Sequence, residues 1–213
     1  MIEPFGLVLG LVGVVWGLLA DRISARWPPH EDGSVRPPDW RTVVVAVVGG
    51  AAMGALPGRF GDAGPVEIAL FGGYFLALVL LLATDLDQRL LPDLVTLPLI
   101  PVVLVVGLAG ANPLVRDDLP AAIAVAVGLP LVLFVLSIPF GSGAIGLGDL
   151  KLLVSVGLIA GLSRTIVGVV SGALLAGVVV LGLLATRRVT LRSYIPFGPF
   201  LILGAIWGVL GGR

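Results

Sequence analysis

The sequence contains no cysteine, and its only histidine is His30. Disulfides, thiolate zinc sites and cysteine nucleophiles are therefore excluded, and one imidazole cannot build a multi-histidine metal site. Charged residues are also scarce, at 12% of the chain, against about 25% in soluble domains. The net charge is zero and there is no basic tract, so we expect no nucleic-acid partner. Carboxylates remain as the groups able to do chemistry, and we expect neither a metal nor a bound cofactor.

Long apolar runs dominate the chain. Hydrophobic residues make up 58% of the sequence, and the mean hydropathy is +1.13. Apolar runs occur at about 5–20, 42–58, 66–84, 94–110, 119–140, 150–163, 165–186 and 196–211. A membrane core takes about 20 helical residues to cross, so the run at 150–163 is short, which favours a tilted or partly re-entrant segment. We predict an all-α, polytopic integral membrane protein with about eight transmembrane helices, in one domain covering residues 1–213.

Glycine is abundant, with 31 residues, about twice the average usage. Small residues four positions apart allow membrane helices to approach closely. This spacing occurs at Gly50/Gly54/Gly58, Gly157/Gly161, Gly168/Gly172 and Gly204/Gly208/Gly212. We therefore predict that these glycines lie at helix contacts.

The basic residues predict an orientation. No Lys or Arg precedes the first run, so we expect a retained transmembrane helix and not a cleavable signal. With the N-terminus outside, nine basic residues fall in inside loops and four outside, as the rule for cytoplasmic loops favours. The inside set is Arg22, Arg26, Arg36, Arg41, Arg89, Lys151, Arg187, Arg188 and Arg192, and the outside set is Arg59, Arg116, Arg164 and Arg213. This places the first cytoplasmic loop at 21–41 and puts the 85–93 and 141–150 loops on one side.

Acidic residues occur at the membrane edge in the first of these two loops. Asp85 directly follows an apolar run, where a carboxylate is costly. Asp87 follows it closely, and the two could simply form the polar end of a helix. Asp93 comes after Pro92, and we expect it to cap the next helix.

The second loop contains a glycine-rich turn that ends in an aspartate. Gly146 and Gly148 precede Asp149, and Lys151 follows it. The glycines remove side chains that would keep another backbone or an extended peptide away from the carboxylate, and they tolerate unusual φ/ψ values. A helix cap would explain the aspartate. It would not explain the three crowded glycines before it, which include Gly143, or the lysine after it.

Two carboxylates on one side of the membrane can work together. If they are held close, both cannot ionise easily, so one keeps a proton while the other acts as a base. The base can activate water for attack on a peptide carbonyl, and the acid can protonate the leaving nitrogen. The sequence therefore predicts that Asp85 and Asp149 form an acid–base pair.

Three stretches resemble a known family, from about residue 67 to the C-terminus. The stretches 85–93, 146–153 and 195–200 resemble the type IV prepilin peptidases, membrane aspartyl proteases of the G-x-G-D type. The resemblance implies cleavage of the short basic leader of type IV prepilins or related pseudopilins, after a glycine, at the cytoplasmic face of a bacterial or archaeal plasma membrane.

Matching these stretches by position implies which residues form the site. The catalytic pair would be Asp85 and Asp149, and the turn 196–199 would be structural. The supporting positions would be Gly146, Gly148, Lys151, Asp87 and Asp93. Among these, Asp93 would be a cap and Lys151 a local positive charge.

The first cytoplasmic loop departs from the family pattern. Many bifunctional members carry there a larger domain with paired C-x-x-C motifs, associated with methylation of the new pilin N-terminus by S-adenosylmethionine. Residues 26–40 take that place here and contain no cysteine. N-methyltransferase activity is therefore doubtful, and S-adenosylmethionine would be a cofactor only if that activity were retained. Three acids of this loop, Glu31, Asp32 and Asp39, could attract the basic leader.

Other functions fit the same residues. A G-x-G-D protease of preflagellin or presenilin type would keep the mechanism and change the membrane substrate. Acids within Gly/Pro-interrupted helices also mark ion routes, as in a proton-coupled transporter. In a purely structural membrane subunit, the acids would only cap helices.

Overall fold

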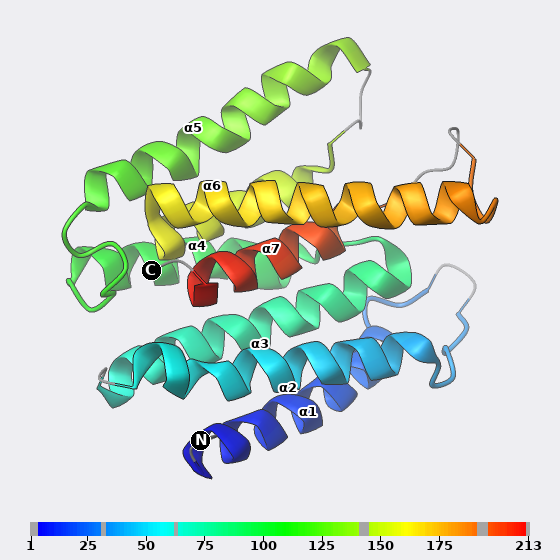
Figure 1. The fold of residues 1–213 in the computed structure, drawn as a ribbon, viewed down its shortest axis with the longest axis horizontal. Helices are drawn as coiled ribbons and strands as arrows, with labels where there is room; N and C mark the ends of the chain where they lie inside the picture. Colours follow the sequence, from blue (N-terminus) through cyan, green and yellow to red (C-terminus); the bar gives the residue numbers. More distant parts are fainter. Residues whose placement is uncertain (1–3, 31–32, 62–63, 141–144, 191–195, 212–213) are drawn as a thin grey trace.

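The structure, a computed structural model, describes residues 4–30, 33–61, 64–140, 145–190 and 196–211. These residues form seven α-helices, one short 3₁₀ turn and no strand (Figure 1). The helices are α1 (Pro4–Ser24), α2 (Trp40–Phe60), α3 (Pro65–Gln88), α4 (Asp93–Leu108), α5 (Leu119–Ser137), α6 (Leu147–Ala185) and α7 (Gly198–Gly211). The all-α prediction is confirmed.

Five of the described helices, α1, α2, α3, α5 and α6, are long and apolar enough to cross a membrane. The helices α4 and α7 are apolar but shorter, with 16 and 14 residues. Many large apolar side chains face outward, including Leu11, Leu174 and Val178, each about two-thirds exposed. Soluble proteins rarely expose continuous apolar surfaces of this kind. The outer surface therefore suits a lipid environment.

The helix α6 joins two of the predicted runs, but it is not one straight rod. Gly161 has φ +76° and ψ 178°, outside the helical region. The hydroxyl of Thr165 donates to the carbonyl of Val156 over 3.4 Å, whereas nine residues of straight helix span about 13 Å. Glycine adopts a positive φ without steric cost. The chain therefore folds back at Gly161, and the run that looked too short for a crossing is the first arm of a hairpin.

The contacts of α7 agree with this reversal. The start of α7, at Gly198, lies beside Asp149 of the first arm. Further along α7, Gly204 faces Gly168, and Gly208 faces the backbone of Arg164. Asn112 donates to the carbonyl of Ile159 over 2.9 Å, which satisfies one of the carbonyls left free where the first arm ends. The second arm of α6 therefore runs antiparallel to both the first arm and α7.

With α6 divided in this way, successive helical segments alternate between the two ends of the molecule. In Figure 1, α1 begins and α7 ends at one end, while the α1–α2 loop, the α3–α4 junction and the starts of α6 and α7 lie at the other. We call this second end, which carries Asp85 and Asp149, the Asp85 end. The 85–93 and 145–150 segments lie together there, as predicted, and so do the described basic residues assigned to the inside.

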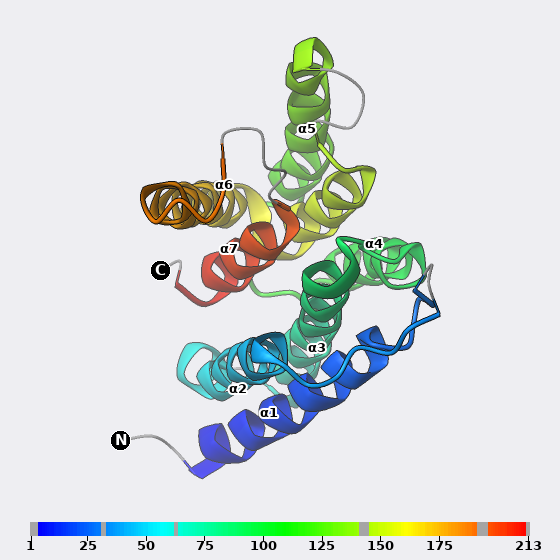
Figure 2. The same cartoon turned by 90° about the vertical axis from the view of Figure 1, so that its right-hand side faces the viewer.

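The helix α3 forms the centre of the bundle, in contact with α1, α2, α4 and α7 (Figure 2). Its side chains Phe71, Phe75 and Leu78 are fully buried, and Phe71 stacks on Phe60 of α2 with ring centroids 4.2 Å apart. Because α3 is enclosed on several sides, its last turn holds the polar residues of the Asp85 end in fixed positions.

Glycines allow several helix contacts, as predicted. Gly13 of α1 meets Gly49 of α2 backbone to backbone, and Gly204 of α7 meets Gly168 of α6 in the same way. Gly58 is different, because no described atom lies within 4 Å of the position of an added Cβ. The packing prediction was wrong for Gly58, and Gly212 lies outside the described residues.

Candidate active site

Asp85 lies in the last turn of α3 and is 5% exposed. The residue after the helix is the C-cap Arg89, which has a left-handed backbone (φ 55°) and whose N–H donates to the carbonyl of Asp85 over 2.9 Å. The carboxylate oxygen Oδ2 is buried and has no hydrogen-bond partner in the described part of the chain. An unpaired buried oxygen is costly. This oxygen is therefore available to a water molecule or to a substrate.

Asp149 lies in the first turn of α6, three residues after the N-cap Gly146. The backbone N–H of Gly146 donates to its carboxylate, as an acid does at the third position of a capping box. The capping interpretation is thus right in part. The other oxygen, Oδ1, lies toward the start of α7.

Gly198, the first residue of α7, brings the two carboxylates together. A Cβ added to Gly198 would stand 2.8 Å from Cγ of Asp85 and 3.2 Å from Oδ1 of Asp149. Both carboxyl groups therefore approach one point, which only a residue without a side chain leaves open. We had expected the 196–199 turn to be merely structural. The signal that could have identified Gly198 was a glycine held between Pro196 and Pro199.

A cavity of about 570 Å³ opens beside this point. Its lining includes Asp85 and Asp149, and four segments complete it: 27–28, 89–94, 146–148 and 196–198, together with Lys151. The cavity thus joins three stretches predicted from the sequence to one that was not, the 27–28 segment. It offers space for an extended peptide next to the two carboxylates.

Among the remaining supporting residues, the role expected for Asp93 needs a correction. The N-cap of α4 is Pro92, and Asp93 makes no capping hydrogen bond. Its carboxylate instead accepts two hydrogen bonds from Lys151, at 2.7 and 2.8 Å. The cap prediction for Asp93 was wrong, because the lysine of α6 offers a charged donor. Lys151 lines the cavity, and its role as a local positive charge for the site stays a prediction.

The glycines before Asp149 act through packing and not through unusual backbone angles. Gly146 has φ −66° and ψ 137°, values open to any residue. A Cβ on Gly148 would lie 3.0 Å from Cβ of Leu91, so this glycine lets the start of α6 approach the 85–93 segment. Gly143 lies outside the described residues.

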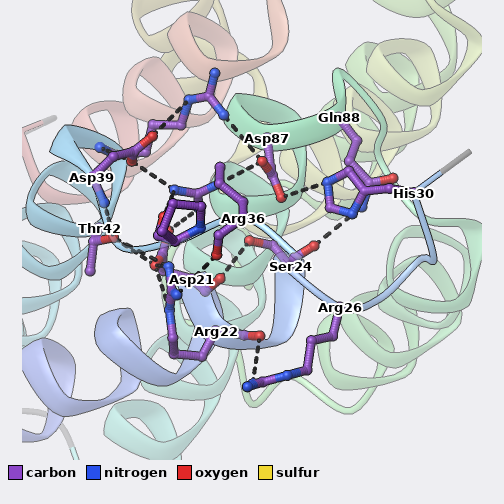
Figure 3. Close-up of polar contacts among 12 residues, drawn as sticks. Asp21, Arg22, Ser24, Arg26, His30, Arg36, Asp39, Thr42, Asp87 and Gln88 are labelled. Carbon is purple, nitrogen blue, oxygen red and sulfur yellow. Dashed lines mark hydrogen bonds and ion pairs between the residues drawn. The ribbon is translucent and has the colours of Figure 1, made fainter. Parts of the chain in front are cut away.

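Asp87 lies outside the cavity and belongs to a polar cluster under the α1–α2 loop (Figure 3). Its carboxylate pairs with Arg36 at 2.6 Å, Arg41 at 3.1 Å and His30 at 3.3 Å. Asp21, at the end of α1, is fully buried and also pairs with Arg36. The sequence analysis missed this cluster.

Arg36 is the centre of that cluster, joining Asp21, Asp39 and Asp87. Burial alone would lower the pKa of its guanidinium, but the hydrogen bond and charge of Asp21, with the charges of Asp87 and Asp39, raise it above the usual value. Arg36 therefore stays charged at any working pH.

The acids proposed to attract a basic leader fall into two groups. Asp39 caps α2 by accepting from the N–H of Arg41 over 2.9 Å, and it pairs with Arg36 at 2.7 Å. Its charge is therefore partly used within the protein. Glu31 and Asp32 lie outside the described residues. Within the described ranges, no group of three His, Cys, Asp or Glu side chains could hold a metal ion.

Comparison with known proteins gives a consistent result. Residues 72–181, which include Asp85 and Asp149, match the Type IV leader peptidase family. The chain is 39% identical over 158 residues to a protein of Burkholderia pseudomallei (strain K96243), covering 73% of this chain and 50% of that one. It is 30% identical over 183 residues to a protein of Pectobacterium carotovorum subsp. carotovorum, covering 85% and 62%.

Both relatives are named "Prepilin leader peptidase/N-methyltransferase". A protein of Aeromonas hydrophila with the same name is 31% identical over 135 residues, covering 62% of this chain and 47% of that one. The chain spans about half the length of the curated relatives it matches. No solved structure matches it. The match covers more than half of the chain and contains both Asp85 and Asp149, and it shows that this chain belongs to the type IV leader peptidase family.

Proposed function

We propose that this protein is an aspartic endopeptidase that cleaves the leader peptide of a type IV prepilin or related pseudopilin. The observation that carries the proposal is the meeting of Asp85 and Asp149 beside Gly198, at the wall of a cavity, with one buried oxygen of Asp85 unpartnered. The similarity to prepilin leader peptidases supports the choice of substrate.

The geometry supports a mechanism in which water attacks the peptide directly. One carboxylate, ionised, takes a proton from a water molecule as that water attacks the scissile carbonyl carbon. The other, protonated, donates a hydrogen bond to the carbonyl oxygen and then gives a proton to the leaving nitrogen. The two groups act as a pair, so their titration belongs to both. Asp149 is held by its bond to the Gly146 N–H, and Asp85 by the buried end of α3.

The proposal includes a membrane orientation. The Asp85 end would face the cytoplasm, with the N-terminus outside and about eight crossings of the plasma membrane, counting the two arms of α6 separately. The described basic residues at the Asp85 end support this orientation. Since the chain lacks cysteine, single cysteines placed at Arg187 and at Arg116 can be labelled in intact cells. A membrane-impermeant reagent should label position 116 and not position 187, and the reverse pattern would overturn the orientation.

Cleavage is tested with purified protein and a purified prepilin in detergent. Asp85→Asn and Asp149→Asn should each abolish cleavage, because each removes one member of the acid–base pair while keeping the side-chain shape. The matched control is Asp117→Asn, at an exposed position at the opposite end. All three variants should unfold at wild-type temperature. Cleavage that persists in either active-site variant would exclude the proposed mechanism.

The same assay examines methylation and substrate class. The proposal covers cleavage alone, so with S-adenosylmethionine present the mass of the new pilin N-terminus should show no added methyl group. A preflagellin and a presenilin-type substrate serve as alternatives in the panel, and faster cleavage of either would change the assigned substrate. The buried carboxylates in the described residues lie at the Asp85 end and not along a route through the bundle, which disfavours a transporter.

A further inference from the structure

One wall of the cavity comes from outside the part of the chain that matches the family. Trp27 and Pro28, in the loop between α1 and α2, line the same cavity as Asp85 and Asp149. The family match begins at residue 72, so this wall is a feature of the first loop of this chain. An indole ring offers a large, rigid apolar surface, and such a surface at a catalytic cavity can bind a substrate side chain.

The wall is fixed to the helix that carries a catalytic carboxylate. The side-chain amide of Gln88, the last residue of α3, donates to the carbonyl of Pro28 over 2.7 Å. It also donates to the carbonyl of Ser24 over 3.2 Å (Figure 3). The N–H of Trp27 donates to the carbonyl of Ile23 over 2.8 Å. Gln88 follows Asp85 by three residues, so the two lie one above the other on α3. Movement of the 27–28 segment is therefore coupled to the last turn of α3.

The other side of the same loop is held as well. Arg36 and His30 both pair with Asp87, at 2.6 and 3.3 Å, which adds two contacts between the loop and the same helical turn. The loop is thus bound to α3 on both sides of the segment that bears Trp27. A wall held in this way is preorganised, so little conformational entropy is lost when a ligand binds.

The chemistry of the surrounding lining indicates what this wall would contact. Trp27 shares the cavity with the apolar side chains of Leu90, Leu94 and Phe197, so the lining offers apolar surface as well as charged groups. An apolar substrate side chain placed there leaves water for a matching surface. Because the cavity also contains both carboxylates, that side chain would belong to a residue beside the scissile bond.

We propose, on the basis of the peptidase function above, that Trp27 contacts the substrate and selects a bulky apolar residue beside the scissile bond. Gln88 is the positioning residue that holds this wall at the cavity. Trp27 contributes to binding and does not take part in the bond-breaking step.

Cleavage kinetics test whether Trp27 selects the bulky apolar residue. The substrates are the parent prepilin and versions in which each apolar residue flanking the scissile bond is replaced by alanine. Trp27→Ala should raise KM for the parent by about tenfold, the usual scale for lost apolar contact in a specificity pocket, with little change in kcat. It should also abolish the preference for the bulky residue. Trp27→Phe should restore most of both, and Val35→Ala, at an exposed site of the same loop, should behave as wild type.

Gln88→Ala should reproduce the rise in KM, and combining it with Trp27→Ala should add little, since the two residues act through one wall. If Trp27→Ala lowered cleavage of all substrates by one common factor, the residue would be structural only and the proposal would be wrong. Thermal unfolding of each variant separates loss of folding from loss of binding.

Cross-linking tests the contact without any turnover. In the cysteine-free chain carrying Asp85→Asn and Asp149→Asn, Trp27→Cys should form a disulfide with a substrate cysteine beside the scissile bond and not with one ten residues away. Val35→Cys should form neither. If the wild-type protein cleaves prepilin but this cross-link does not form, the contact between Trp27 and the substrate is refuted and the peptidase function is kept. If the cross-link forms but the wild-type protein does not cleave, the peptidase function is refuted and the contact is kept.

Discussion

Gly198 gives the sharpest test of the active-site geometry. A Cβ at this position would stand 2.8 Å from Cγ of Asp85, whereas non-bonded carbon atoms prefer about 3.5–4.0 Å. Gly198→Ala should therefore displace the Asp85 carboxyl group, or the start of α7, by roughly 1 Å. A displacement of this size at reacting groups can cost about 10²-fold in rate. We expect kcat for prepilin cleavage to fall by about that factor.

The control and the readouts separate geometry from stability. Gly73→Ala is on α3, the helix of Asp85, and no described atom lies within 4 Å of its added Cβ. It should keep wild-type kcat. Both variants should elute and unfold like wild type in detergent, because the Gly198 clash involves a side-chain carboxyl group that can move. If Gly198→Ala kept near-normal kcat, the two carboxylates would not need the arrangement seen here, and the reasoning from this contact would be wrong.

Three further predictions concern stability. Arg36→Ala removes the cation shared by the buried carboxylates of Asp21 and Asp87 and should cost about 3–5 kcal/mol, measured by chemical unfolding in detergent. Arg36→Lys should recover only part of this loss, since lysine lacks the planar fork. Gly204→Ala places a methyl group 3.1 Å from the carbonyl carbon of Gly168 and should cost about 1–3 kcal/mol by overpacking, whereas Gly177→Ala, with open space around it, should be neutral. Lys151→Ala breaks only an exposed ion pair with α4 and should change unfolding by less than about 1 kcal/mol. A large loss on Lys151→Ala, or none on Arg36→Ala, would contradict the burial argument.

Long apolar runs and the positions of the charged residues predicted the main features of this protein. The runs gave an all-α membrane-type fold, and the basic residues placed the Asp85 and Asp149 segments at one end, where both line one cavity. These features follow from local chemistry, since long apolar runs form helices and consecutive helices alternate direction. The sequence did not predict the reversal at Gly161. An apolar run that contains glycine has the same composition whether it forms a straight helix or a hairpin.

The missed residues share another cause. Gly198 matters because of atoms contributed by α3 and α6, and Asp87 binds Arg36 across 51 residues of chain. Neither relationship leaves a local pattern in the sequence. The wrong prediction that Asp93 caps α4 has the same cause, because the lysine that binds it, Lys151, is 58 residues away in the sequence.

The base of the α1–α2 loop has a consequence for how the chain can change in length. Thr42, at the start of α2, donates to the carboxylate of Asp21 in the last turn of α1 over 2.7 Å. This hydrogen bond joins the two helices at the base of the loop that connects them. Gly33 lies beyond this junction, exposed and with open space around it. Extra sequence inserted after Gly33 would lengthen a loop whose ends are already fixed, and lengthening such a loop costs little entropy. The loop is therefore an insertion point, at which this protein could carry an additional soluble module while Asp21 and Asp87 keep their partners.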